Sequence, residues 1–298
     1  MKIGVDIGGS HIAVGLIDNF GKIICKTEED LDNNIQFDNF ERKLIDSIIK
    51  QIDYVLTKKN TDITKISLIG IAVPGMVSET SIIKAENLHI KDFNITREIN
   101  KYYNVPIKLR NDAKCAALAE KEYGSLKRAE DTIFVTIGTG IGGAVFLGGE
   151  LLAPKKYEGF EIGHMVIKKD GLKCNCGRNG CFEKYASIKS LKTKIAKEKK
   201  VKSISVEELK QVLEDDDNES IKRIVDEYIE DLSLGLSNLI NVFEPQVISI
   251  GGSFAFYKSL LEKLKNKINE EFLFNKKNPP KIVLAKLKND AGIVGSVL

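Results

Sequence analysis

The sequence lacks a long apolar run, an apolar leader and a strong excess of charge of one sign. No run of apolar residues is long enough to cross a bilayer, so we expect no membrane association. The chain opens directly on strand-like residues 2–6 and shows no signal-peptide pattern, so we expect a cytoplasmic protein. Its 45 basic and 42 acidic residues leave a net charge of only +3, which predicts no strong electrostatic attraction to nucleic acid.

Cysteine is also scarce, with five residues in 298. In a reducing compartment these cysteines are not expected to form structural disulfides. Cys25 and Cys115 lie in apolar surroundings and fit small core positions. The other three fall within eight residues of one another, which calls for a separate explanation.

The same order of elements occurs twice along the chain. Residues 2–27 predict a strand, a glycine turn, a second strand, a turn and a third strand, and residues 132–152 repeat that order. We therefore infer two related lobes, for which 298 residues suffice. Periodicity further predicts helices over 39–58, 95–103, 113–123, 187–243, 257–272 and 291–298, and strands over 67–73, 106–109, 247–250 and 282–285.

Three glycine turns each follow a strand. Glycine lets the backbone approach a phosphate closely, and successive N–H groups can then point at its oxygens. For one isolated turn, a tight hairpin is the preferred interpretation. Three together favour nucleotide binding, although none matches the P-loop or the dinucleotide fingerprint. The turns are Gly8-Gly9-Ser10, Gly138-Thr139-Gly140 and Gly251-Gly252.

Two aspartates follow predicted strands. Asp6 stands beside the first glycine turn, where a carboxylate could hold Mg²⁺ through water next to nucleotide phosphates. Asp112 comes after Asn111 at the start of a predicted helix. Taken alone, that pair is best interpreted as a helix N-cap.

The most specific pattern is a group of metal-ligand residues. His164 is one of only three histidines, and Cys174, Cys176 and Cys181 follow it closely. Three thiolates and one imidazole form a closed tetrahedral set, which predicts a structural Zn²⁺ that pins a loop. Glu161 and Glu183 flank these ligands and could reach inward to hydroxyl groups.

With these motifs in place, the chain resembles the ROK family, named for repressors, open reading frames and kinases, over nearly its full length. Residues 6–10 look like the first phosphate loop of that family, and residues 138–143 look like the second. The segments 161–164 and 174–183 match its signature and zinc motifs.

The resemblance implies an α/β, actin-like ATPase (ribonuclease H-like) fold: a duplicated two-lobe fold with the active site in the cleft. The N-terminal lobe would comprise residues 1–115 and the terminal helix 288–298, and the C-terminal lobe residues 116–287. The resemblance further implies a homodimer that binds ATP with Mg²⁺ and a sugar. Asp112 would be the catalytic base for the sugar 6-hydroxyl. The sugar would also meet Gly75, Asn87, Asn111, Glu161, His164 and Glu183, while the ATP and Mg²⁺ contacts would include His11.

Two positions depart from the family pattern. The family usually has Thr-Lys after the Gly-Gly pair, where this chain has Ser10-His11, so a fixed positive charge is missing near the phosphates. Phe160 precedes Glu161 where relatives usually carry Gly or Ala, and its ring could reshape the sugar pocket.

Three functions are compared on this basis. A hexose kinase acting on glucose is the first, with N-acetylmannosamine or N-acetylglucosamine as the alternative acceptor. A sugar-responsive transcriptional repressor is the second, but it would need a helix-turn-helix before the first phosphate loop, where the sequence leaves no room. A sugar-binding module without activity is the third, and it would have lost Asp112 or the glycine turns.

Overall fold

The computed structural model describes residues 1–9, 11–31, 40–153, 161–215, 217–274 and 276–298. These residues form two compact units. The first lobe comprises residues 1–124 with 289–298, and the second lobe comprises residues 125–152 with 161–288. Among the described residues, no helix combines the length and the apolar character that a bilayer-spanning segment needs.

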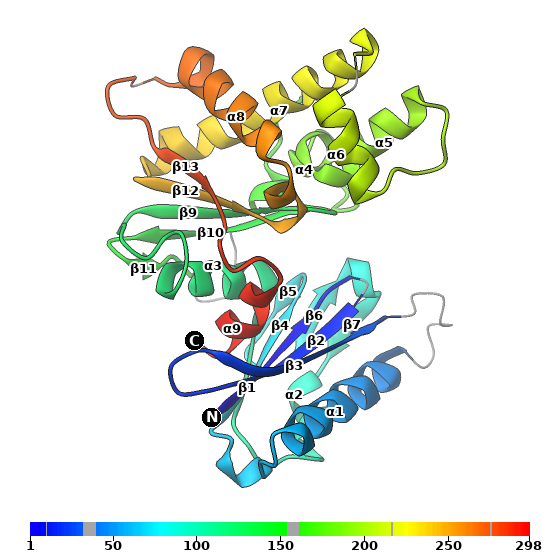
Figure 1. Cartoon of the computed structure of the whole chain (residues 1–298), viewed down its shortest axis with the longest axis vertical. Coiled ribbons are helices and arrows are strands. Elements are labelled where there is room, and N and C mark those ends of the chain that lie inside the picture. Colours follow the sequence, from blue (N-terminus) through cyan, green and yellow to red (C-terminus); the bar gives the residue numbers. More distant parts are fainter. Residues whose placement is uncertain (10, 32–39, 154–160, 216, 275) are drawn as a thin grey trace. The chain divides into compact units, whose positions relative to one another are not determined.

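The first lobe is built on a five-stranded sheet with the order β3-β2-β1-β4-β8 (Figure 1). Strands β1, β2 and β3 are antiparallel neighbours, whereas β1, β4 and β8 run parallel to one another. A second, three-stranded sheet has the order β5-β6-β7. The strands are β1 Lys2–Ile7, β2 His11–Ile17, β3 Ile23–Asp30, β4 Leu68–Val73, β5 Met76–Val77, β6 Ile82–Ala85, β7 Ile90–Phe93 and β8 Ile107–Asn111.

Helices pack on this sheet because its central strands are apolar on both faces. Helix α1 buries Leu44, Ile48 and Ile52 in a core shared with β1, β2 and β4. Helix α9 packs directly on β1 and β4, where Gly4 and Gly70 are register partners (Figure 1). The helices are α1 Phe40–Lys58, α2 Ile95–Asn100, α3 Asp112–Glu122 and α9 Ala291–Ser296, with short helical turns η2 Ile63–Lys65, η3 Glu86–Leu88 and η7 Lys288–Asp290.

The second lobe repeats this plan. Its sheet has the order β11-β10-β9-β12-β13, again with an antiparallel three-strand side and parallel neighbours beyond it. The duplicated two-lobe α/β fold predicted from the repeated hairpin is confirmed. The strands are β9 Thr132–Ile137, β10 Ile141–Leu147, β11 Glu150–Leu151, β12 Val247–Gly251 and β13 Lys281–Leu284.

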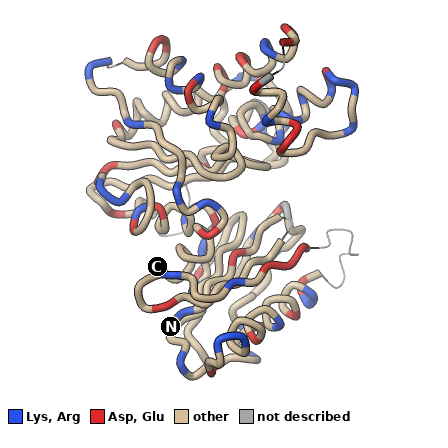
Figure 2. The backbone as a smooth tube through the Cα atoms, in the orientation of Figure 1, with Lys and Arg blue, Asp and Glu red and all other residues tan. Residues whose placement is uncertain are grey.

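The helices of the second lobe share one apolar core with its sheet. Positively and negatively charged residues are interspersed along α7 and α8 (Figure 2). Lys263 of α8 pairs with Asp226 of α7 at 3.2 Å. Exposed pairs of this kind contribute about 0–1 kcal/mol, so the apolar core holds the lobe together. The helices are α4 Glu183–Ala186, α5 Ile188–Glu198, α6 Val206–Asp215, α7 Glu219–Phe243 and α8 Lys258–Lys267, with the turns η4 Ile162–His164, η5 Gly252–Phe256 and η6 Ile268–Phe272.

Two predictions of secondary structure were wrong in part. Residues 187–243 are not continuously helical, because α5 ends at Glu198 and a loop leads to α6. The helix predicted over 257–272 changes to a π-helical turn after Lys267. The sheet β5-β6-β7 was not predicted, because β5 has only two residues and the other two strands have four each.

Candidate active site

In the first lobe, three parallel strands bring polar residues to the same edge of the sheet. Asp6 lies opposite Ala72 of β4, and Val73 lies opposite Asn111 of β8. The carboxyl ends of parallel strands are the usual place for ligand sites in α/β sheets. Asp6, Gly75 and Asn111 are therefore gathered from segments far apart in the sequence.

Asn111 and Asp112 form the junction between β8 and α3. The Asn111 side chain caps the helix by accepting from Lys114 N at 3.3 Å, so the N-cap interpretation is correct for Asn111. Its Nδ2 also donates to Gly75 O at 3.0 Å, which ties the two predicted sugar contacts together. Asp112 is the first residue of the helix, and its Oδ1 accepts from Ala113 N at 2.8 Å.

Asp6 and Asp112 lie close enough to affect each other electrostatically. Burial raises the pKa of Asp6 from 3.8 to about 7, and the negative charge of Asp112 adds to that rise. Lys26 opposes the shift and Glu28 reinforces it. Two neighbouring carboxylates repel each other when both are ionised, and a divalent cation would relieve that repulsion. Carboxylate oxygens are also ligands that Mg²⁺ prefers, so the predicted Mg²⁺ fits the carboxyl end of β1.

The first glycine turn joins β1 to β2. Gly8 N donates to His11 O at 2.8 Å, which closes the turn, while Gly9 is exposed and Ser10 lies outside the described residues. The His11 ring is half-exposed, and its Nε2 is 3.9 Å from Glu28 Oε1. Of the other predicted sugar contacts in this lobe, Asn87 belongs to η3.

In the second lobe, two glycine turns lie side by side. Gly251 is the register partner of Thr136, and a Cβ at Gly252 would lie 2.7 Å from Ile137 O. Gly252 also has a φ of +68°, a conformation that only glycine adopts readily. The structure therefore brings the second and third predicted phosphate turns together at the ends of β9 and β12.

A cavity of about 540 Å³ opens at these two turns. This volume is within the range of small-molecule and cofactor sites. Gly138, Thr139, Ser253 and Tyr257 line one part of it, and α5 with residues 201–204 and 206 lines the rest. Its lining combines apolar groups with four lysines and, among the described residues, no carboxylate; the lysines are Lys189, Lys192, Lys197 and Lys202.

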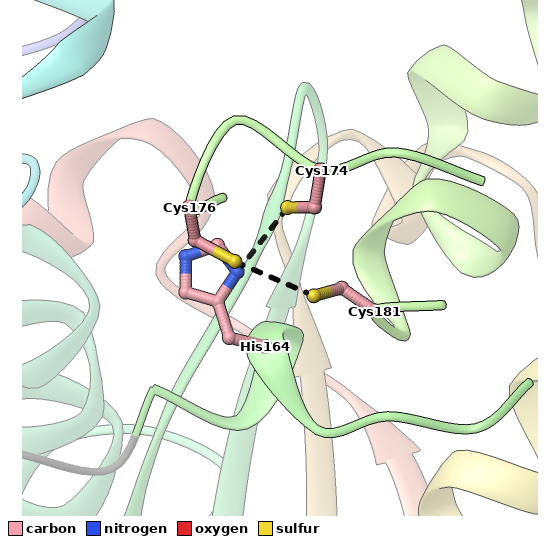
Figure 3. Close-up of side chains that lie close together, drawn as sticks. All are labelled: His164, Cys174, Cys176 and Cys181. Atoms are coloured by element: carbon pink, nitrogen blue, oxygen red, sulfur yellow. Dashed lines mark hydrogen bonds between the residues drawn. The ribbon is translucent and has the colours of Figure 1, made fainter. Parts of the chain in front are cut away.

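The four predicted zinc ligands converge in one cluster (Figure 3). Their ligand atoms all lie within 4.8 Å of one another. Cys174 Sγ is 3.6 Å from His164 Nδ1, and Cys176 Sγ is 3.5 Å from Cys181 Sγ. The sulfur separation is too long for a disulfide and close to the ~3.8 Å expected between thiolates bound tetrahedrally to zinc. The cluster therefore fits Zn²⁺.

The thiols of this cluster differ in acidity. Hydrogen bonds from Arg178, chiefly from its backbone N–H, lower the pKa of Cys176 to about 6. Burial raises the pKa of Cys181 to about 12. A bound Zn²⁺ would hold all three sulfurs as thiolates, since only the thiolate is a strong ligand.

The whole chain matches one known protein family: residues 2–298 match the ROK family. The chain belongs to the ROK family. Its ROK relatives include both kinases and regulators. It is 28% identical to the xylose repressor of Caldicellulosiruptor bescii, over 99% of this chain and 76% of that protein. It is also 28% identical to the glucokinase of Thermotoga maritima, over 99% of this chain and 95% of that enzyme.

Among solved ROK structures, the chain resembles a Streptomyces griseus glucokinase in complex with glucose and AMPPNP. The TM-score is 0.84 at 24% identity, and the match covers 99% of this chain and 97% of that one. This likeness shows that the lobes have the actin-like ATPase fold.

Some residues of the candidate site were not predicted from the sequence. Ser253 and Tyr257 line the cavity, and Lys189 N donates to Gly138 O at 3.1 Å. Ser253 follows the third glycine turn directly, so its position in the sequence could have indicated it. The Lys189 contact is made by its backbone amide, for which side-chain identity gives no signal.

Proposed function

We propose that this ROK protein is an ATP-dependent hexose kinase that transfers a phosphoryl group to the 6-hydroxyl of a sugar, with glucose as the preferred acceptor. The observation that carries the proposal is the cavity at the Gly138 and Gly252 turns. It has a size suited to a nucleotide, a glycine turn in its lining and four lysines that could meet phosphate charge. The glucose and AMPPNP in the similar S. griseus structure support both substrates.

In this proposal the second lobe holds the nucleotide. The backbone around Thr139 and Gly140 would meet the phosphates, with Gly251, Gly252 and Ser253 beside them. In the first lobe, Asp6 would hold Mg²⁺ through water, and Gly8, Gly9 and His11 would approach the phosphates. Phosphoryl transfer depends mainly on positioning and charge neutralisation, which these groups would supply.

Asp112 would orient the acceptor hydroxyl and take its proton. Its place after β8 and the 2.8 Å hydrogen bond that its Oδ1 accepts from Ala113 N suit a group that must point in one direction. Asn111 and Gly75, already linked to each other, would hold neighbouring sugar hydroxyls. Asn87, Glu161, His164 and Glu183 complete the proposed sugar set, and zinc would fix the ring of His164.

A coupled assay of ATP consumption over glucose, mannose, fructose, allose and the N-acetylhexosamines tests this function. We expect the highest kcat/KM with glucose; a preference for N-acetylmannosamine or N-acetylglucosamine would replace glucose by the alternative acceptor. Binding of a sugar without any turnover would favour a regulatory role like that of the xylose repressors.

The Asp112→Asn variant tests the role of the base. We expect kcat to fall by about 10²–10⁴-fold, while sugar affinity measured by calorimetry stays within a few-fold. Asp226→Asn, on the exposed face of α7, is the matched control and should keep normal turnover. Full turnover in Asp112→Asn would show that another group accepts the proton.

A further inference from the structure

One residue, Ile141, follows the second glycine turn directly and is held from two sides. Its backbone N–H donates to Glu183 Oε2 at 3.0 Å. Its carbonyl oxygen lies against Gly163, where a Cβ would come within 2.2 Å. Ile141 is also the first residue of β10, so its position sets where the turn ends.

Both neighbours of Ile141 lie next to zinc ligands. Gly163 precedes His164, and Glu183 follows Cys181 by two residues. The two segments are also joined to each other, because Phe182 N donates to Met165 O at 2.7 Å and Val166 forms a β-bridge with Cys181. The zinc cluster therefore ties together the two segments that hold Ile141.

Glu183 also touches the turn itself. A Cβ at Gly140 would lie 2.2 Å from Glu183 Oε2, so the carboxylate occupies the space beside this glycine. On the other side of the turn, Lys189 N donates to Gly138 O. The turn is thus enclosed by the starts of α4 and α5.

We propose that Glu183 is a positioning residue for the nucleotide: it transmits the rigidity of the zinc cluster to the Gly138–Gly140 turn. This rests on the proposed function, in which the turn binds phosphates. A carboxylate has two oxygens, so one can hold the turn while the other meets a sugar hydroxyl. The zinc cluster then orders the phosphate turn as well as the sugar-binding histidine.

A double-mutant cycle on Glu183→Ala and Gly140→Ala tests the proposal. The probe is AMPPNP with Mg²⁺, titrated by calorimetry without sugar, and zinc content is measured for every variant. We expect Glu183→Ala to weaken AMPPNP binding about tenfold, since it removes a charge-assisted acceptor. Gly140→Ala should weaken binding in the parent protein and cost clearly less when Glu183 is already alanine, because the clash is gone.

Glu183→Gln is the matched control. Its side-chain oxygen can still accept from Ile141 N, so AMPPNP affinity should stay within about threefold of the parent. If Glu183→Ala does not fold, Glu183→Asp takes its place, because the shorter side chain cannot reach Ile141 N and should weaken nucleotide binding.

Unchanged AMPPNP affinity in both Glu183→Ala and Glu183→Asp, or equal costs of Gly140→Ala in both backgrounds, would overturn the proposal. Equal weakening by Gln and Ala would also overturn it, because the acceptor oxygen would then be irrelevant. A parent protein that binds no AMPPNP would instead overturn the proposed kinase function.

Discussion

At the residue scale, Asp6 is costly to ionise without a cation, because it is buried and Asp112 is negatively charged. Burial and the charge of Asp112 raise the pKa of Asp6 to about 7. Near neutral pH the metal-free protein is therefore a mixture of protonated and ionised Asp6. We expect a divalent cation to remove the proton and lower that pKa.

The pH dependence of stability follows from this pKa. The folded state binds the proton more tightly than the unfolded state, whose Asp6 has the ordinary value of 3.8. The stabilisation that the folded state gains from this bound proton is complete below about pH 4, and it is lost as the pH rises through about 7. The Asp6→Asn variant has no carboxylate to ionise at this position. Without metal, its free energy of unfolding relative to the parent should therefore increase by on the order of 2 kcal/mol as the pH rises from about 5 to about 8.

Urea unfolding of both proteins at several pH values, with and without Mg²⁺, measures this difference. Mg²⁺ at about pH 8 should narrow the gap by stabilising the ionised pair of the parent. A difference that does not change with pH would contradict the raised pKa.

Residue patterns in the sequence predicted some contacts of the site better than others. The zinc ligands could be predicted because His and Cys are rare and chemically specific, and their spacing is short. The contact between Glu183 and Ile141 N could not, because a backbone amide has no signature and the partners are 42 positions apart. Phe160, whose ring was expected to shape the sugar pocket, lies outside the described residues.

At the scale of elements, the zinc loop, residues 165–182, consists of turns and contains no helix or strand. It lies between η4 and α4, and its two β-bridges are isolated, Val166 with Cys181 and Lys173 with Asn179. A segment with so little regular structure needs another constraint to stay in place, and the four-ligand cluster supplies one.

Zinc should therefore be present and stabilising. We expect about one zinc per chain, and Cys181→Ser should lose it and lower the melting temperature by roughly 5 °C or more. Cys25→Ser, in β3 of the first lobe, is the control and should keep the metal. Metal analysis and scanning calorimetry measure both effects; a zinc-free parent protein would remove the basis for a pinned loop.

Elements with strong periodicity were predicted well, and short ones were not. The span of α1 was predicted within one residue, because its apolar stripe is continuous. The break between α5 and α6 was missed because residues 199–203 contain neither Gly nor Pro, and lysine is a good helix former. The helix ends locally at Lys200, which adopts a φ of +58° while Val201 N donates to Ala196 O at 3.0 Å. Glycine usually supplies this C-cap conformation, so a lysine there gives no sequence signal.

At the scale of the whole molecule, each lobe has a core of its own. The large core of the first lobe draws on residues 3–109, and that of the second lobe on residues 133–282. The first lobe also depends on α9, which approaches the sheet so closely that Cβ atoms at Gly4 and Gly70 would lie 2.1 and 2.2 Å from backbone oxygens of the helix.

Gly70→Ala should therefore destabilise the first lobe selectively. The new methyl group would meet Ser296 O, a backbone atom that cannot rotate away, and we expect a loss of on the order of 3 kcal/mol. Gly15→Ala is the comparison: its Cβ would meet the Ile293 side chain, which can adjust, so the loss should be smaller.

Hydrogen exchange followed by mass spectrometry would locate the effect. In Gly70→Ala, exchange should increase in β1 and β4 and stay nearly unchanged in β9 and β12. Equal acceleration in both lobes would show that they unfold as one cooperative unit.

The close packing of α9 on β1 also has a consequence for biosynthesis. Translation delivers β1 first and α9 nearly three hundred residues later. During synthesis, the first sheet lacks α9 on one of its faces until the last residues are made. All residues of the second core have been synthesised by residue 282, before α9. The lobe whose synthesis starts first is thus the one that receives its last packing element after the other core has been made.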